Sequence, residues 1–410
     1  MVTPDAEHDG GDGKVAVLTF SQIARDRSVQ RQCALLDAMG HRPLVIAYAN
    51  EGDDIGFPLR RWPAPQPTTA HRLKTVLCQL PAHLGLWAAR TGFWAEPRHR
   101  WALSQLTTYE PRLVVANDWP ALVVAAEHKA IMQDQSKRSP YLHYDTHEFA
   151  TLEFDENRWW RIVYKPVVTQ LERAYINRAD SVSTVGPRLA EAIQAHYGLN
   201  RKPAVVRNIP DSIVLPERAK MSWPLRILYH GQVLPDRGLE ALIDSVPHWR
   251  EPHQLTIRGD GSASYLKRLK HQAAASNGAV SVTFEPAVKP DKVMSIAAAT
   301  ADVGVHFTPL GTAQRHFSLP NKLFEYIGAG LAVAVSPGVD LKRIVEGHGV
   351  GVVSPDASAA AIAETINGLT REGVAAFKAQ ARVAAKTLCW EIEQTTLRSM
   401  LAAPLERVVT

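Results

Sequence analysis

The chain is 410 residues long, with 46% hydrophobic residues, 21% charged residues and a formal net charge of +5. This balance is typical of a soluble globular protein, and the length predicts two domains of about 200 residues each. No run of about 18 uncharged apolar residues occurs, which argues against a membrane-spanning helix. The basic residues form no stripe interleaved with aromatic residues, which argues against nucleic-acid binding. A phosphorylated small molecule or an anionic membrane surface would equally attract the excess positive charge.

The start of the chain and its cysteines favour a cytoplasmic protein. Residues 1–13 are acidic and rich in glycine, without the basic and apolar regions of a signal peptide, so we expect a disordered tail. The three cysteines, Cys33, Cys78 and Cys389, lie far apart and lack the spacing of metal ligands. Such a sparse and odd number favours a reducing cytosol over a disulfide framework.

Short apolar runs alternate with longer segments of helical period along almost the whole chain. In the first half the runs predict strands at residues 14–20, 43–48, 113–116, 141–144 and 181–185. In the second half they predict strands at residues 226–229, 254–258, 280–284, 303–307, 331–335 and 351–353. Strands rich in β-branched residues and separated by helices are typical of βαβ units with a buried parallel sheet.

The pattern divides the chain into two α/β halves. Residues 211–224 hold two prolines and mixed charges without clear periodicity, so we expect a linker there. The linker separates a Rossmann-like domain at residues 14–210 from a second one at residues 225–387. A helical segment at residues 388–410 is expected to pack back on the N-terminal domain.

Residues 71–94 form an amphipathic and basic segment that Pro81 interrupts. The plainer interpretation is a helical hairpin on the N-terminal sheet. The other is a surface that rests on anionic lipid, where Arg and Lys contact headgroups while Leu and Trp enter the interface. The sequence leaves both open.

Two glycine-containing loops follow strands in the second half. Gly231 and Gln232 follow the strand at 226–229, and Arg237 opens the next helix, while Gly259 and Gly261 follow the strand at 254–258. Glycine lets a ligand approach the backbone, and the amides of a helix start attract phosphate. Each turn alone is ordinary turn chemistry. Together they predict a ligand site, because ligands of open α/β sheets bind at the carboxyl ends of the strands.

A third segment leads from Ser318 and Leu319 into a helix that contains Asn321, Lys322 and Glu325. Pro320 favours a helix start, and the first amides of such a helix are free. Lys322 would add positive charge near a phosphate, and Glu325 would accept hydrogen bonds from a ribose diol. The alternative is a capped amphipathic helix with Glu325 in solvent, although the apolar and small neighbours indicate tight packing.

The block SLPNKLFEYIGAGLAVAVSPG, residues 318–338, resembles the donor-binding signature of GT-B glycosyltransferases, in particular of the large retaining family 4. Further segments are similar to other parts of that family: YHGQVLPDRGLEALI, LTIRGDG, YDTHEF, RADSVSTVGPRLAEAIQAHYG and VVRNIPD. The resemblance covers nearly the whole chain after the tail. It implies two Rossmann-like domains facing a central cleft, with acceptor binding in the first, nucleotide-sugar binding in the second, and the final helix crossing back.

The resemblance also implies roles for single residues on the donor side. Glu325 matches the second glutamate of the family's Glu-x7-Glu motif, which grips the ribose, whereas Phe317 stands where the first glutamate contacts the sugar. Gln232 replaces the usual arginine of the diphosphate clamp, and Arg237 and Lys322 would offset the charge of the leaving diphosphate. The implied donor-binding set is Gly231, Gln232, Arg237, Gly259, Gly261, Ser318, Leu319, Asn321, Lys322 and Glu325. No Asp-x-Asp motif occurs, so we expect activity without a metal or other cofactor.

On the acceptor side, His147 matches a family histidine that reaches the donor sugar near the reacting centre. Without the resemblance, a loop or helix-capping histidine would be the simpler interpretation. The implied catalytic set is His147, Arg237 and Lys322. The candidate acceptor-side residues are Arg25, Arg27, Asp118, Asp145 and Glu148.

These observations predict retaining transfer of a hexose-type sugar from a UDP- or GDP-sugar to a hydroxyl of a sugar, lipid-linked or small-molecule acceptor. Surface polysaccharide or glycolipid biosynthesis is the expected pathway, with contact to the inner face of the cell membrane as an option. A nucleotide-sugar epimerase and a catalytically silent scaffold remain alternatives, the latter because of Phe317. A phosphorylase would need a pyridoxal lysine in a much longer chain, and a dehydrogenase would need a G-x-G-x-x-G after residues 14–20.

Overall fold

The computed structural model describes residues 13–62, 76–214, 221–275 and 282–406. The chain divides into two compact units, of which unit 1 comprises Met1–Val206 with Gln394–Thr410 and unit 2 comprises Arg207–Glu393. Most of the predicted tail and residues 71–75 of the amphipathic segment lie outside the described residues. Of the predicted linker, residues 211–214 and 221–224 are described and belong to unit 2.

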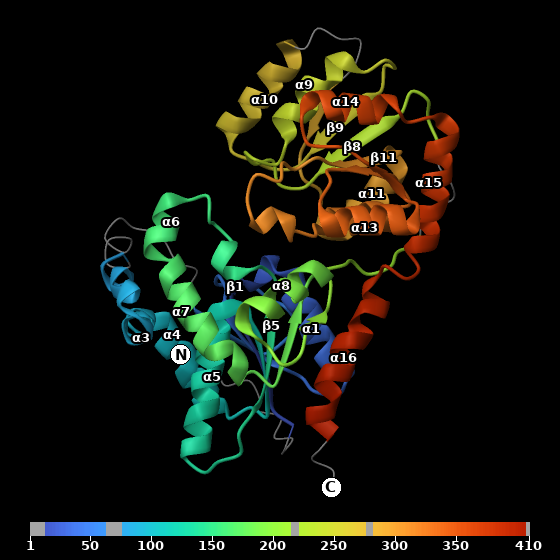
Figure 1. Ribbon diagram of the computed structural model, residues 1–410. Coiled ribbons are helices and arrows are strands. Elements are labelled where there is room, and N and C mark those ends of the chain that lie inside the picture. Colours follow the sequence, from blue (N-terminus) through green and yellow to red (C-terminus); the bar gives the residue numbers. More distant parts are fainter. Residues whose placement is uncertain (1–12, 63–75, 215–220, 276–281, 407–410) are drawn as a thin grey trace. The chain divides into compact units, whose positions relative to one another are not determined.

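Unit 1 is built on a seven-stranded parallel sheet of order β3-β2-β1-β4-β5-β6-β7 (Figure 1). Its central strands are buried apolar runs, as a sheet covered on both faces requires. The strands are β1 (Val15–Gln22), β2 (Leu44–Tyr48), β3 (Leu59–Trp62), β4 (Leu113–Asn117), β5 (Tyr141–Thr146), β6 (Ser181–Thr184) and β7 (Ala204–Val205).

The helices of unit 1 cover both faces of this sheet. They are α1 (Arg27–Ala38), α3 (Leu86–Trp94), α4 (Pro97–Tyr109), α5 (Asp118–Asp134), α6 (Arg158–Val163), α7 (Lys165–Tyr175) and α8 (Pro187–Tyr197), with the 3-10 turns η1 (Ile23–Arg25), η2 (Leu80–Leu84), η3 (Ala150–Leu152) and η4 (Ile176–Arg178). The side chain of Asp26 caps α1 by accepting the Val29 N–H at 3.1 Å.

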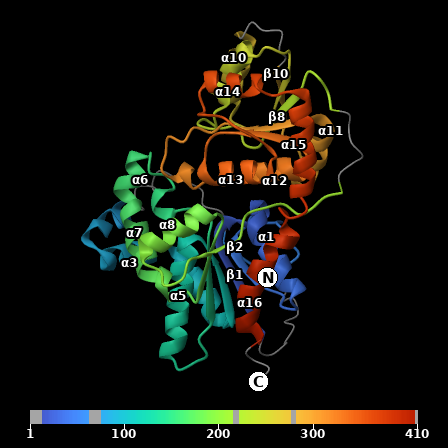
Figure 2. The same ribbon diagram turned by 45° about the vertical axis from the view of Figure 1, so that its right-hand side comes forward.

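Unit 2 contains a six-stranded parallel sheet of order β10-β9-β8-β11-β12-β13 (Figure 2). Its strands are β8 (Arg226–His230), β9 (Gln254–Arg258), β10 (Val282–Glu285), β11 (Val303–His306), β12 (Ala332–Val335) and β13 (Gly351–Val353). Its helices are α9 (Leu239–Ser245), α10 (Ala263–Ala275), α11 (Val293–Thr300), α12 (Asn321–Gly328), α13 (Val339–His348), α14 (Ala359–Asn367) and α15 (Arg371–Ala384), with η5 (Val246–His248), η6 (Pro290–Lys292) and η7 (Gln314–His316).

The last helix, α16 (Trp390–Glu406), begins in unit 2 and continues in unit 1. At its start, the Glu393 carboxylate accepts hydrogen bonds from Nε and Nη2 of the Arg207 guanidinium, the shortest of them 2.6 Å, and Trp390 N–H donates to Pro210 O at 2.9 Å. Farther along, Arg112 Nη2 donates to the carbonyls of Pro404 and Leu405 at 3.3 and 3.2 Å. The two chain segments that pass between the units, near residues 207–210 and 390–393, are therefore hydrogen-bonded to each other.

In each sheet the order of the strands along the chain reverses at one place. A ligand site is expected at that place. In unit 1 the chain builds β1 to β3 on one side and β4 to β7 on the other, and in unit 2 it builds β8 to β10 and then β11 to β13. The switch points therefore lie between β1 and β4 and between β8 and β11, where doubly wound sheets bind ligands. The prediction of two Rossmann-like domains is confirmed. Among the described residues no helix has the length and apolar character to span a membrane.

Candidate active site

The first candidate site lies at the switch point of unit 2, where helix α12 is fixed to the sheet by Tyr326. The Tyr326 hydroxyl accepts the backbone N–H of His230 at 3.0 Å and donates to Val305 O at 3.3 Å. The β8–β11 pairing ends at Leu228 and Gly304, so the phenol connects the two strands just beyond their last paired residues. A Cβ added to Gly304 would lie 2.2 Å from the Tyr326 ring, so only glycine admits this contact.

The loops after β8 and β9 pack backbone against backbone at the same edge. Gly231 N–H donates to Arg258 O at 3.0 Å, and Val233 N–H donates to Asp260 O at 2.9 Å. Gly259 has φ +155°, and a Cβ there would lie 1.7 Å from Gly231 O. Packing therefore requires glycine at position 259, besides the ligand approach that the sequence suggested. Gly231 itself remains exposed and has φ +116°.

Lys322, in the first turn of α12, lies above an aromatic ring at this edge. Its Nζ is 3.9 Å from the centroid of the Tyr229 ring. Among the described residues, no carboxylate lies within salt-bridge distance of the ammonium. Burial, together with the positive charge of Arg237, lowers the pKa of Lys322 to about 7, although Glu325 acts in the opposite direction. Near neutral pH a fraction of Lys322 is therefore the neutral amine, which can take up a proton when an anion binds beside it.

Glu325 faces a buried histidine that the sequence did not single out. His230 Nε2 lies 3.3 Å from Glu325 Oε2. Burial, with the charges of Lys322 and Arg258, lowers the pKa of His230 to about 3, so the imidazole is neutral at physiological pH. His306 at the end of β11 is also buried, and burial together with Lys322 and Arg237 lowers its pKa well below the usual value.

The remaining donor-side candidates differ in exposure. Leu319 is buried and Phe317 is half-buried, with its N–H donating to Gln314 O at 3.0 Å. No side chain caps the start of α12, so its first amides and the positive end of its dipole are available to an anion. The exposed candidates at this edge are Gln232, Arg237, Ser318 and Asn321.

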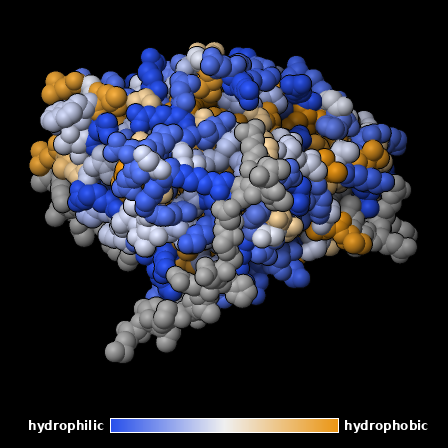
Figure 3. All heavy atoms as spheres, turned by 90° about the horizontal axis from the view of Figure 1, so that it is seen from below, coloured by the Kyte–Doolittle hydropathy of each residue, from blue (hydrophilic) through white to orange (hydrophobic). Residues whose placement is uncertain are grey.

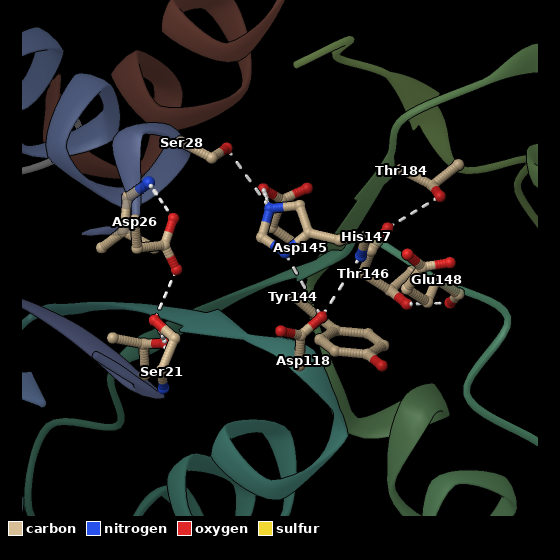
Figure 4. Close-up of polar contacts among 12 residues, drawn as sticks. Ser21, Asp26, Ser28, Asp118, Tyr144, Asp145, Thr146, His147, Glu148 and Thr184 are labelled. Carbon is tan, nitrogen blue, oxygen red and sulfur yellow. Dashed lines mark hydrogen bonds and ion pairs between the residues drawn. The ribbon is translucent and has the colours of Figure 1, made fainter. Parts of the chain in front are cut away.

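The second candidate site lies at the carboxyl ends of β4 and β5 in unit 1 and is centred on His147 (Figure 4). His147 Nδ1 is 3.3 Å from Asp118 Oδ1, and Nε2 is 3.3 Å from Asp145 Oδ2. The His147 backbone N–H also donates to Asp118 Oδ1 at 3.3 Å. Both ring nitrogens therefore face a carboxylate, which is an arrangement suited to an imidazolium.

The charges of this group are strongly coupled. Burial by itself would lower the pKa of His147, but the carboxylates of Asp118 and Asp145 outweigh it and raise that pKa well above its usual value. Burial would likewise raise the pKa of Asp145, yet His147 holds it below its usual range. Asp145 also accepts hydrogen bonds from Ser183 Oγ at 2.5 Å and Gln32 Nε2 at 2.6 Å. Asp145 is thus fully partnered and fixed.

Asp118 differs from Asp145 in exposure and backbone conformation. Its side chain is 44% exposed, whereas that of Asp145 is 3% exposed. It is the first residue of α5 and has φ +64°, a left-handed conformation that is uncommon outside glycine and is found at functional sites. Asp118 is therefore the carboxylate of the pair that a ligand can reach.

The first βα loop contributes a residue other than the expected arginines. Ser28 Oγ lies 3.3 Å from His147 Nε2. Arg25 is exposed, and Arg27 contacts Gln30 of its own helix at 3.4 Å. Glu148 is exposed next to His147 in the chain. The structure thus gathers His147, Asp118 and Asp145, adds Ser28, and shows no contact between His147 and either arginine.

Within the described parts of the chain, no group of three or more His, Cys, Asp or Glu residues is arranged to hold a metal ion. Activity without a metal stays a prediction.

Known proteins match both units. The family described as Glycosyl transferase 4-like domain matches residues 26–209, and the family described as Glycosyl transferases group 1 matches residues 224–372. No curated protein matches the chain by sequence.

Solved structures with the same fold are numerous. Anabaena HepE in complex with UDP has a TM-score of 0.67 at 17% identity, covering 95% of this chain and 100% of that one. Sucrose-phosphate synthase of Thermosynechococcus elongatus has a TM-score of 0.70 at 15% identity, covering 95% and 99%. The lipopolysaccharide outer core galactosyltransferase WaaB has a TM-score of 0.65 at 14% identity, covering 95% and 99%.

The two parallel-sheet units and these matches define a transferase enzyme with the GT-B fold. The chain belongs to the GT-B glycosyltransferases with group 1 and 4-like domains.

Proposed function

We propose that this glycosyltransferase moves a hexose-type sugar, with retention, from a UDP- or GDP-sugar to a hydroxyl of a sugar, lipid-linked or small-molecule acceptor. The observation that carries the proposal is α12, which presents Lys322 and Glu325 at the β8–β11 switch point and is fixed there by Tyr326. Anabaena HepE, which shares the fold, has been solved with UDP and with UDP-glucose, and this supports a nucleotide-sugar donor.

The donor would bind with its diphosphate at the start of α12. The free amides, Lys322 and the exposed Arg237 would meet the phosphates, while Glu325 would accept hydrogen bonds from the ribose hydroxyls. A diphosphate beside Lys322 would restore the full charge of the ammonium, whose pKa is about 7 in the free protein. In the transition state the same cations would stabilise the leaving diphosphate. These side chains would serve in place of a metal.

In unit 1, the imidazolium of His147 would donate its Nδ1–H to the donor sugar in exchange for the contact with Asp118, and Asp118 would then orient the acceptor hydroxyl. Because the acceptor attacks the face that the diphosphate leaves, a diphosphate oxygen would take the acceptor's proton. No separate base is then required. Asp145 would keep His147 charged and in place through the 3.3 Å contact.

The test is calorimetry with UDP and GDP, followed by donor hydrolysis and transfer assays, on the wild type and on Glu325→Ala and Arg237→Ala. Glu346→Ala is a matched control, because Glu346 is an exposed helical glutamate of the same unit. We expect both site variants to lose nucleotide affinity and turnover while the control keeps them. Rates and affinities like the wild type in both site variants would overturn the site.

Two other functions stand as alternatives to this proposal. Phe317 in place of the sugar-contacting glutamate favours a catalytically silent GT-B scaffold, which would show no nucleotide affinity in the calorimetry. A nucleotide-sugar epimerase-like enzyme would convert the donor sugar without any acceptor, which product analysis would reveal.

We also propose a cytoplasmic enzyme of surface polysaccharide or glycolipid biosynthesis that contacts the inner face of the cell membrane. Two solved structures of the same fold, the lipopolysaccharide outer core galactosyltransferase WaaB and WaaG, a glycosyltransferase involved in lipopolysaccharide biosynthesis, support such a pathway. The basic amphipathic segment at residues 71–94 supports the membrane contact.

A further inference from the structure

Unit 1 carries a group of exposed apolar side chains that come from two segments far apart in the sequence. Leu84 is 86% exposed, Trp87 81% and Trp159 70%. We call this group the apolar ridge, and it consists of Leu77, Leu80, Leu84, Leu86, Trp87, Trp159 and Ile162. Large hydrophobic side chains that are exposed together mark an interaction surface, whereas single ones need no explanation.

The two segments are joined directly. The His83 side chain in η2 hydrogen-bonds the Ile162 carbonyl in α6 at 2.7 Å. Both η2 and α3 also pack against α7, the helix that follows α6. In Figure 1, α3 and α6 lie on the same side of unit 1, and hydrophobic side chains gather at that margin in Figure 3. The ridge is therefore one surface, although its parts are separated by about 70 residues in the chain.

The exposure is a property of one face of these helices. Ala88, Ala89 and Phe93 of α3 are buried, and so is Val163 of α6. The same short helices thus attach to unit 1 through one face and present Trp87, Trp159 and Ile162 on the other. Nothing else in their position requires large apolar side chains at the outer face.

The charges beside the ridge identify an anionic lipid surface as its partner. Residues 76–94 and 158–163 contain no Asp or Glu. Arg158 and Arg161 are exposed in α6 next to Trp159 and Ile162. Of the two acidic residues that shortly precede α6, Glu156 is exposed, whereas Asp155 is paired with Lys165 at 2.6 Å. Tryptophan with flanking arginine is typical of the membrane–water interface.

We propose that the apolar ridge docks on an anionic membrane surface, with Trp87, Leu84 and Trp159 in the boundary between headgroups and acyl chains. Arg158 and Arg161 contact the headgroups, and the helices lie on the membrane because they are too short to cross it. The apolar ridge would be the membrane contact named in the proposed function, and its link to a lipid-linked acceptor rests on that proposed function. Docking on the membrane itself requires no sugar donor.

The experiment is vesicle sedimentation with the full chain, using phosphatidylcholine vesicles with and without phosphatidylglycerol. We expect binding to the anionic vesicles that weakens with salt, and a loss of at least about tenfold in Trp87→Ser/Trp159→Ser. Arg158→Gln/Arg161→Gln keeps the apolar side chains and should lose much of the preference for anionic lipid. The control Val339→Ser/Val383→Ser removes exposed apolar side chains from unit 2 and should bind like the wild type.

Two results would overturn the inference: absence of wild-type binding to anionic vesicles, or equal binding by the tryptophan variant. A wild-type dimer that becomes monomeric in the tryptophan variant, without vesicle binding by either, would assign the ridge to self-association instead. Light scattering and the thermal midpoint distinguish these outcomes from misfolding. UDP calorimetry on the same proteins separates a failure of docking from a failure of the proposed function, because the ridge variants should bind nucleotide normally.

Discussion

Each candidate site contains a histidine, and the two histidines differ in charge, since one is a cation and the other is neutral. His147 in unit 1 lies 3.3 Å from two carboxylates, which raise its pKa well above the usual value. His230 in unit 2 is buried, and burial together with the charges of Lys322 and Arg258 lowers its pKa to about 3. Burial alone lowers the pKa of a histidine in both places, so the neighbouring charges decide the outcome. Unit 1 thus presents an acid pair around a cation, and unit 2 presents cations around neutral rings.

The largest expected effect comes from removing a carboxylate around His147. Asp145→Asn leaves a half-buried imidazolium with one acidic partner, and we expect a loss of about 3 kcal/mol in the free energy of unfolding near neutral pH. The pKa of His147 should fall at the same time, which an NMR titration of the ring protons would show. Glu148→Gln, an exposed carboxyl in the same loop, is the control. An unchanged His147 titration in Asp145→Asn would contradict the coupling.

The pH dependence of that loss has a definite sign. Because the folded-state pKa of His147 is raised, its stabilising contribution is full below the unfolded value of about 6.5 and disappears as pH rises through the folded-state pKa. The deficit of Asp145→Asn relative to the wild type should therefore shrink at high pH. Denaturant unfolding at several pH values measures it.

The second prediction removes the cation of unit 2. Lys322→Met should weaken UDP or GDP binding by about 2 kcal/mol, or roughly 30-fold, because a charge-assisted contact to the diphosphate is lost. The pKa of His230 should rise, since Lys322 is one of its lowering charges. Lys342→Met removes an exposed lysine of the same unit and should have no effect. Equal nucleotide affinity in Lys322→Met would show that the phosphates bind elsewhere.

The third prediction concerns nucleotide affinity against pH. The pKa of Lys322 in the free protein is about 7. Above that pH, the free energy of nucleotide binding therefore includes the cost of protonating the amine. Affinity should fall about tenfold between pH 7 and 8.5 in the wild type and stay nearly flat in Lys322→Arg, whose guanidinium keeps its charge. A slope that survives in Lys322→Arg would assign the titration to another group.

The smallest effect is expected at the hydroxyl that connects β8 and β11. Tyr326→Phe keeps the ring against Gly304 but leaves the His230 N–H and the Val305 carbonyl without this partner. We expect a loss of about 1 kcal/mol in stability and a modest loss of nucleotide affinity. Tyr141→Phe on β5 is the matched control, since none of the described residues bonds its hydroxyl. Equal losses of stability and nucleotide affinity in both variants would contradict a specific role of the Tyr326 hydroxyl.

The sequence predicted the central strands well because apolar β-branched runs between helices leave few alternatives. β3 and β7 were missed. β3 carries the exposed Arg60 and Arg61 between half-buried ends, and β7 has two residues, so neither has the apolar pattern of a buried strand. Both lie at the edges of the sheet of unit 1, where one side of the strand is unpaired.

The site was predicted only in part, for a related reason. Lys322, Glu325 and His147 lie in a recognisable local pattern, whereas Ser28, His230 and Tyr326 act through contacts with residues up to 119 positions away. The left-handed backbone of Asp118 has no signal in the sequence either. Arg25 and Arg27 were expected from their position in the first βα loop to meet an acceptor or a phosphate, and this stays a prediction. Ser28 of the same loop, which the sequence did not single out, contacts His147.

Calorimetry of UDP binding at pH 8 in two buffers with different ionisation enthalpies tests the central claim about unit 2 most directly. If the diphosphate binds beside Lys322, whose pKa in the free protein is about 7, binding should take up close to one proton per nucleotide in the wild type. Lys322→Arg should bind with no such uptake. Nucleotide binding without proton uptake in the wild type, or the same uptake in Lys322→Arg, would contradict the account.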